Sequence, residues 1–198
     1  MKRNQLRFIL YCLMLGLITI SMVASTGCSC NPSPAPAAAG ALSASSTSAT
    51  SAASTTVGTT YQNTTWKYSI QVLPGYTVNS AVPKSIYILS GDQRADILIT
   101  VGASTANLDT YTGTAVQVFK SRYPDYKEQS RNSIKAAGGT SANFISLTYT
   151  RDGVAVQGYM LITMKNDNGY VAVGATPPAD WSKSGKDLET MIKSLKPD

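Results

Sequence analysis

The sequence of 198 residues contains no histidine, and its three cysteines, Cys12, Cys28 and Cys30, all lie near its beginning. Histidine is the side chain that most often performs general acid–base catalysis at neutral pH, and no cysteine nucleophile remains after residue 30. Serines are abundant, but none lies in a G-x-S-x-G nucleophile motif. We therefore predict no catalytic residues and a protein that is not an enzyme.

Residue patterns that bind metals or phosphates are also scarce. A structural zinc site needs about four nitrogen or sulfur ligands. The chain has no histidine and three cysteines, one of which lies in the apolar run near its beginning, so it does not supply such a set. The segment GDQRAD, 91–96, carries Asp92 and Asp96, but it lacks the alternating oxygen ligands and the glycine of a calcium loop. We interpret it as a solvated turn. The segment AAGG, 136–139, is a turn without the Lys-Ser/Thr pair of a phosphate-binding loop. We expect no metal and no cofactor.

The excess of positive charge is smaller in the folded part than in the whole chain. The sequence has 17 basic and 11 acidic residues, a formal net charge of +6. Lys2, Arg3 and Arg7 precede a long apolar run, and without residues 1–27 there remain 14 basic and 11 acidic residues. A net charge of +3 on a domain needs no polyanionic partner, so we expect no binding to nucleic acid.

Five basic residues nevertheless fall within sixteen positions, diluted by Asp125 and Glu128. They are Lys120, Arg122, Lys127, Arg131 and Lys135. They form either a basic strip that faces an anionic partner or lipid headgroups, or a helix end followed by the outer face of an edge strand.

An uncharged apolar run covers residues 8–24, and basic residues precede it. It is longer than a usual signal-peptide core and shorter than a usual membrane span. The run is followed by STGC, residues 25–28, which resembles the bacterial lipobox, although Ser25 stands where that pattern usually has leucine. The resemblance implies cleavage before Cys28 and attachment of diacylglycerol to its thiol. The alternatives are an uncleaved transmembrane anchor and an ordinary secreted protein.

The two neighbouring cysteines do not suit other roles. A disulfide between Cys28 and Cys30 would be strained. We interpret Cys30 as incidental, with a second acylated or intermolecularly paired thiol as the alternative. Residues 31–60 consist almost entirely of Ser, Thr, Ala, Pro and Gly and carry no charge. Such a segment buries too little apolar area to offset its ordering entropy. We predict a signal peptide over 1–27, a disordered tether over 28–60 and a globular domain over 61–198.

Alternating and helical hydrophobic patterns fill the predicted domain. Hairpin signals occur at RDG, 151–153, and at NDNG, 166–169. A first helix follows Asn107 with an apolar stripe of Leu108, Tyr111, Ala115, Val118 and Phe119. A last helix runs from about Ser184 to Leu195 with a stripe of Leu188, Met191, Ile192 and Leu195. We predict strands over 67–73, 85–90, 95–104, 127–137, 141–150, 154–164 and 169–175, with 95–104 in a central position.

The order of these elements predicts an α+β fold, an antiparallel β-sheet flanked by helices. The segments YSIQVLPGY, 68–76, and YVAVGATPPADWSKSGKDLETMIKSLKP, 170–197, resemble the beginning and the end of PsbP-like domains. The resemblance implies a PsbP-like α/β/α sandwich in which Tyr76 and Trp181 are packing residues. The family includes photosystem II extrinsic subunits, a Ran-binding nuclear transport factor and many bacterial lipoproteins.

These observations together predict a lipid-anchored protein on the outer face of the bacterial cytoplasmic membrane, or on the outer membrane if there is one. We expect an accessory or binding protein that assembles or stabilises a membrane or envelope complex through a protein partner. The alternatives are a surface receptor with a small molecule between sheet and helix, and an unrecognised hydrolase. No ligand-binding residue is evident in the sequence.

Overall fold

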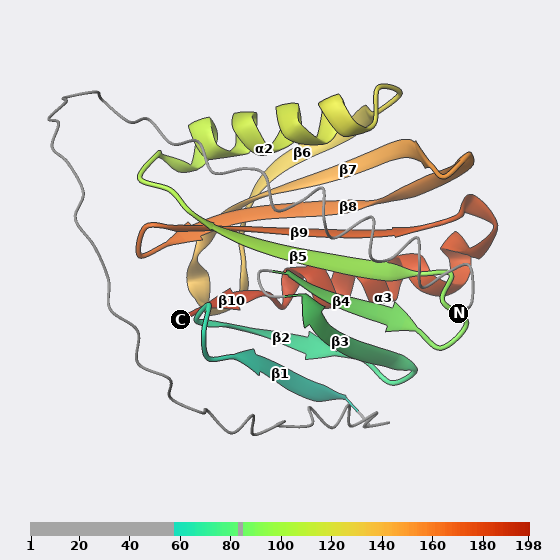
Figure 1. The fold of residues 1–198 in the computed structure, drawn as a ribbon, viewed down its shortest axis with the longest axis horizontal. Coiled ribbons are helices and arrows are strands. Elements are labelled where there is room, and N and C mark those ends of the chain that lie inside the picture. Colours follow the sequence, from blue (N-terminus) through green and yellow to red (C-terminus); the bar gives the residue numbers. More distant parts are fainter. Residues whose placement is uncertain (1–57, 83–84) are drawn as a thin grey trace, which may run out of the picture. The chain divides into compact units, whose positions relative to one another are not determined.

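The structure is a computed structural model that describes residues 58–82 and 85–198 (Figure 1). The predicted signal peptide, Cys28, Cys30 and nearly all of the predicted tether lie outside the described residues. The first strand, β1 (Thr59–Asn63), begins two residues before the start of the domain expected from the sequence.

Seven antiparallel strands form the main sheet, in the order β3-β4-β5-β9-β8-β7-β6. The strands are β3 (Tyr76–Val82), β4 (Ser85–Ser90), β5 (Asp96–Ala103), β6 (Lys127–Lys135), β7 (Ser141–Arg151), β8 (Val154–Lys165) and β9 (Asn168–Thr176). The predicted antiparallel sheet is confirmed, and β5 lies inside it between β4 and β9 as expected. The strand β3 was not expected from the sequence.

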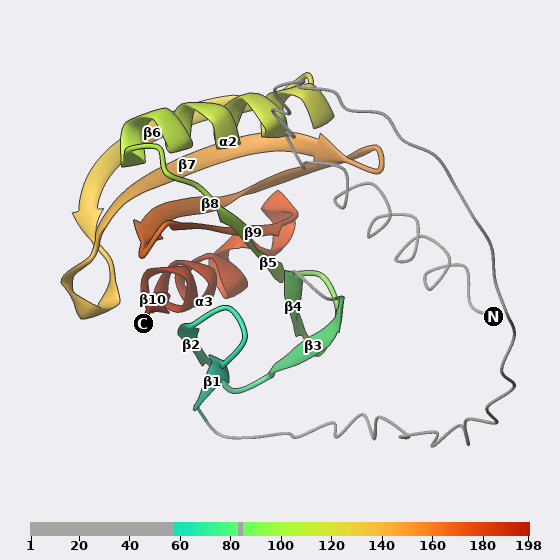
Figure 2. The ribbon, with the colours of Figure 1, turned by 60° about the vertical axis from the view of Figure 1, so that its left-hand side comes forward.

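The two helices, α2 (Leu108–Arg122) and α3 (Trp181–Lys193), lie on opposite faces of this sheet (Figures 1 and 2). Alternate residues of β9 show the two faces: Tyr170 and Ala172 belong to the core under α3, whereas Val173 and Ala175 belong to the core under α2. One helix on each face agrees with the predicted sheet flanked by helices, and the sheet makes up most of the fold.

A second, small sheet has the order β1-β2-β10, with β2 (Tyr68–Val72) between β1 and β10 (Lys196–Pro197). The apolar side chains of β2, Tyr68, Ile70 and Val72, join the core under α3. This sheet therefore covers the side of α3 that faces away from the main sheet (Figure 2). The sequence predicted β2 but neither of its neighbours.

The last helix buries the stripe expected from its sequence. Leu188, Met191 and Ile192 are 0% exposed, and so is Leu195, which lies two residues beyond the end of the helix and not within it as predicted. The helix begins at Trp181, three residues before the predicted start. It approaches the sheet closely because β9 has a glycine there: a Cβ on Gly174 would lie 2.7 Å from Cδ1 of Ile192.

The apolar stripe predicted for the first helix is partly wrong. Asn107 caps α2 as expected, accepting a 2.9 Å hydrogen bond from the Thr110 backbone N–H. Val118, however, is 42% exposed, whereas Thr112 and Val116 are buried. The burial of Thr112 has a polar cause: the sheet under α2 carries Asn143, whose side-chain amide donates to Thr112 Oγ1 at 2.9 Å. Hydrophobicity alone cannot select a buried threonine.

The two predicted hairpins are present. Between β7 and β8, Asp152 and Gly153 both have positive φ, as a tight turn requires. Between β8 and β9 the positive φ values belong to Asn166 and Asp167. Gly169, which also looked like a turn residue, lies instead within β9.

Candidate functional site

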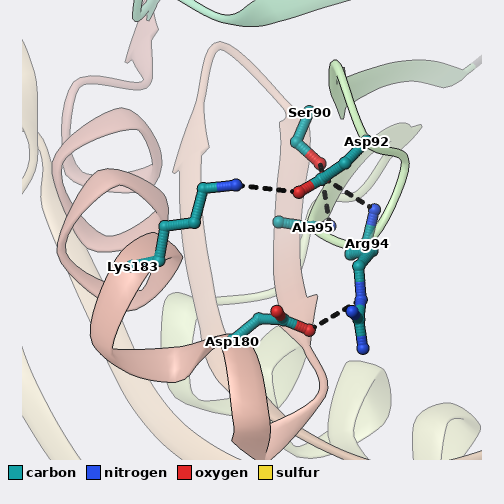
Figure 3. A network of polar contacts seen from close by, with 6 residues as sticks. All are labelled: Ser90, Asp92, Arg94, Ala95, Asp180 and Lys183. Atoms are coloured by element: carbon teal, nitrogen blue, oxygen red, sulfur yellow. Dashed lines mark hydrogen bonds and ion pairs between the residues drawn. The ribbon is translucent and has the colours of Figure 1, made fainter.

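The polar network between β4 and α3 is the arrangement closest to a catalytic group in the described residues (Figure 3). Ser90 Oγ donates a 2.6 Å hydrogen bond to Asp92 and accepts one of 3.0 Å from the Ala95 backbone N–H. Lys183 Nζ donates to the other Asp92 oxygen at 2.9 Å. The hydrogen bonds from Ser90 and Lys183 hold the pKa of Asp92 well below its usual range. Such a carboxylate is a weak base, so the group does not activate Ser90 for nucleophilic attack.

A second ion pair completes this network. Arg94 Nε lies 2.8 Å from Asp180, the residue that precedes α3. Charges of alternating sign, Lys183, Asp92, Arg94 and Asp180, thus join the turn between β4 and β5 to the first turn of α3 (Figure 3). The arrangement holds these two segments together.

The structure does not bring together the carboxylates that were considered for calcium. Asp96 faces Arg151 and accepts two hydrogen bonds from its guanidinium, at 2.8 and 2.9 Å, whereas Asp92 faces Lys183. Within 58–82 and 85–198, no group of three or more Cys, Asp or Glu side chains could hold a metal ion. Cys28, the predicted site of lipid attachment, lies outside the described part of the chain.

The five clustered basic residues are divided between different surfaces. Residues that pair directly across an antiparallel sheet lie on the same face. Lys127 pairs with Thr148, on the face that carries α3, whereas Arg131 pairs with Ile145 on the α2 face. Lys135 lies on the α2 face as well, and Lys120 and Arg122 belong to the last turn of α2. The structure agrees with the second interpretation in showing a helix end followed by an exposed edge strand, but the basic residues of that strand lie on both of its faces and not on one outer face.

Three aromatic side chains form a continuous row on the α3 face of the sheet. The rings of Phe144 and Tyr159 stack with centroids 5.0 Å apart, and Tyr159 contacts Trp181 at 5.2 Å. They come from β7, β8 and the start of α3, and we call them the aromatic strip. Phe144 is 7% exposed, and Tyr159 and Trp181 are partly exposed. Phe144 therefore belongs to the core, and Tyr159 and Trp181 are the members of the strip that contribute partly exposed surface.

Charged and small residues of α3 border the aromatic strip. Lys193 Nζ lies 4.6 Å from the centre of the Phe144 ring and also pairs with Glu189 at 2.5 Å. Burial, and then the nearby charge of Glu189, raises the pKa of Tyr159. Gly185 lies so close to the Trp181 indole that a Cβ there would be 2.9 Å from it. Trp181 is a packing residue, as expected, and it also contributes to the surface.

The sequence did not indicate the aromatic strip. Phe144 and Tyr159 lie in segments correctly predicted as strands, but their contact depends on the register between β7 and β8. A periodicity of two assigns residues to one of two faces and does not say which residues of neighbouring strands meet. Only Trp181 carried a signal, through its place in the segment that resembles PsbP-like domains.

Among the residues that the structure describes, no helix has the length and apolar character needed to span a membrane. No family model matches the chain. No curated protein matches it either.

Solved structures are similar to the chain. Cyanobacterial PsbP (CyanoP) from Synechocystis sp. PCC 6803 is 8% identical, with a TM-score of 0.56 over 71% of this chain and 92% of that one. A protein of unknown function from Pseudomonas aeruginosa, described as a putative regulator, is 16% identical, with a TM-score of 0.48 over 72% and 99% of the two chains. A protein from Bacteroides thetaiotaomicron is 14% identical, with a TM-score of 0.49 over 72% and 49%. The likeness to the cyanobacterial protein shows that the described part of the chain has a PsbP-like fold.

Proposed function

We propose that this chain is an extracytoplasmic accessory protein, anchored by lipid at Cys28, that binds a protein partner in a membrane or envelope complex. The aromatic strip of Phe144, Tyr159 and Trp181 is the observation that carries this proposal. Tyrosine and tryptophan are enriched at protein interfaces because each offers a large apolar surface and few rotatable bonds.

The surroundings of the strip also suit a protein interface. Glu189 and Lys193 stand at its edge, where a partner would meet charged groups that remain in contact with solvent. Gln157 lies two residues before Tyr159 on β8 and is partly exposed on the same face. An apolar centre with a polar rim is the arrangement of a typical non-obligate interface.

The PsbP-like fold supports the accessory role by analogy only, because folds host many functions. The PsbP-like family, which two segments of the sequence resemble, includes extrinsic subunits of a membrane complex and bacterial lipoproteins. An extracytoplasmic location and an anchored state agree with the apolar run and the STGC segment that precede the described residues.

We propose in addition that the protein is not an enzyme. The chain has no histidine. In the described part, Ser90 donates to a carboxylate whose pKa is lowered, so no general base stands beside it. The receptor alternative requires space between a helix and the sheet, but the α3 side chains that face β9 are completely buried. No contact in the described residues favours that alternative.

In-cell photocrosslinking tests the protein interface. A photoreactive amino acid placed at Gln157, beside the strip, should capture one protein that mass spectrometry identifies and that copurifies with the untreated chain. The same group at Val118, an exposed position on α2 at the other face, is the control. Tyr159→Ala should reduce the Gln157 product severalfold. Equal capture of the same protein at both positions, or no loss with Tyr159→Ala, would contradict the proposed interface.

Mass spectrometry of the native protein tests the anchor. The lipid proposal expects a mature chain that begins at Cys28 and carries the mass of diacylglycerol, and a Cys28→Ala variant that is shed or mislocalised. An intact Met1 terminus would show instead that the apolar run is retained as a transmembrane anchor.

A further inference from the structure

The strand β6 is an edge of the main sheet whose side chains are largely exposed. Within the described residues it pairs only with β7, and eight of its nine residues are exposed, Ile134 being the partly buried exception. The helix α2 packs on β7 and β8, and α3 packs on β9, β8 and β5. Figure 2 shows β6 as the outermost strand of the sheet. Both faces of this strand are therefore accessible.

An edge strand of this length offers a row of backbone hydrogen-bonding groups. Successive N–H and C=O groups point alternately to the two sides of a strand, so about half of those in β6 point away from β7. Such a row is a template for pairing with another extended segment. The side chains of β6 then determine which segment can pair with it.

Those side chains are basic on both faces. Lys127 lies on the α3 face, and Arg131 and Lys135 lie on the α2 face, against a single acidic residue, Glu128. Arg131 is already bonded to Glu128, at 2.7 and 2.9 Å, but a guanidinium has five N–H donors and can bind a further carboxylate. An added strand would meet positive charge whichever face its own side chains take.

The same charges disfavour a second copy of this chain as the partner. A two-fold antiparallel pairing of β6 with itself, centred on Arg131, would place Lys127 opposite Lys135. Centring it on Ser133 would place Arg131 opposite Lys135. Like charges directly opposite each other destabilise a sheet. An anionic membrane surface is also a poor partner for β6. The basic side chains lie on both faces of the strand, and a flat surface can contact only one of these faces at a time.

We infer that β6 binds an extended, acidic segment of a partner protein by strand addition. This surface differs from the aromatic strip, so the inference is tested separately from the proposed function. The backbone of β6 would supply the hydrogen bonds, and Lys127, Arg131 and Lys135 would supply the preference for acidic side chains.

The test uses the full chain in detergent micelles and the peptide acetyl-Glu-Val-Glu-Val-Glu-Val-Glu-amide. Binding is measured by anisotropy and by hydrogen exchange of the β6 amides. One control peptide has lysine in place of glutamate, and another has N-methyl groups on two consecutive central residues, which removes a donor from each edge. The variant Lys135→Glu is compared with Lys186→Glu, which changes the net charge equally at an exposed residue of α3.

The acidic peptide should bind and slow exchange of the β6 amides, and both control peptides should fail. Lys135→Glu should raise Kd about tenfold, and Lys186→Glu less than about twofold. Absence of binding would overturn the inference. So would equal binding of the methylated peptide without protection of β6, which would indicate attraction of charges only. Protection of β6 in phosphatidylglycerol vesicles without peptide would identify a lipid surface and would also overturn it.

Discussion

The ring of Tyr111 lies directly against the backbone of Gly169. A Cβ on Gly169 would be 2.1 Å from Cζ of Tyr111, well inside contact distance. Tyr111 belongs to α2 and Gly169 to β9, so this contact fixes how closely the helix approaches the sheet. Burial at this contact raises the pKa of the Tyr111 hydroxyl.

Gly169→Ala should therefore destabilise the domain by about 1–3 kcal/mol, the usual cost of overpacking. The φ of Gly169 is not in the left-handed region, so the effect would be steric. Gly102→Ala is the matched control, because its Cβ would lie 4.0 Å from the Tyr111 hydroxyl, an ordinary contact. Denaturant melts measure the free energy of unfolding of both glycine variants. In a Tyr111→Ala background, the cost of Gly169→Ala should fall markedly; an unchanged cost would contradict this explanation.

Asp96→Asn should lower the free energy of unfolding by more than the loss of a surface ion pair would. Asp96 and Arg151 are 14% and 24% exposed in their side chains and are joined by two hydrogen bonds across 55 positions of sequence. Removing one partner of a largely buried pair leaves a charge without compensation. We expect a loss of about 1–3 kcal/mol. Glu189→Gln, which affects the exposed pair with Lys193, should cost at most about 0.5 kcal/mol. If urea melts showed that Asp96→Asn and Glu189→Gln lower the free energy of unfolding equally, this prediction would be wrong.

The stability of the domain should depend on the ionisation of Asp92. Its pKa is lowered in the folded state, chiefly by hydrogen bonds from Ser90 and Lys183. The contribution of this carboxylate is therefore present above the ordinary aspartate pKa of about 3.9 and is lost as the pH falls below it. Asp92→Asn should lower Tm at pH 6 and flatten the decrease of Tm between pH 5 and pH 2. Asp152→Asn, which changes the net charge equally at an exposed turn carboxylate, is the control. An unchanged slope for Asp92→Asn would refute the prediction.

Residues 58–198 should fold without the rest of the chain, and removal of α3 should prevent folding. Each of the four completely buried residues Leu188, Met191, Ile192 and Leu195 contributes about 1.5–3 kcal/mol through burial. Together they are comparable to the whole stability of a typical domain, about 5–15 kcal/mol. A chain of residues 58–198 should melt cooperatively in calorimetry, whereas residues 58–180 should be unfolded or aggregated. Cooperative melting of the shorter chain would contradict the role given to α3.

Local patterns in the sequence were sufficient to predict most of the strands and α3. They failed where a segment depends on a distant partner. The strand β1 has only Tyr61 to pack and forms by pairing with β2, and β10 consists of two residues that pair with the same strand. In α2, Thr112 is buried because Asn143 lies beneath it, a fact that no pattern within the helix records.

The candidate surfaces were less predictable than the fold. The basic residues of β6 were visible in the sequence, but their division between two faces follows from the pairing with β7 and from its irregular register between Glu128 and Ser130. The aromatic strip joins residues 144, 159 and 181, which only the assembled sheet brings into contact.

The small sheet has a consequence for the order of folding. The strand β2 pairs with Lys196 and Pro197, and the Gln71 backbone N–H donates to Ser194 Oγ across 123 positions at 2.8 Å. These contacts cannot form until residue 197 is available, and pairings so distant in sequence form slowly. A chain threaded through a membrane from its beginning would thus keep β2 unpaired on one edge during passage. It would complete this sheet only after the last strand had emerged.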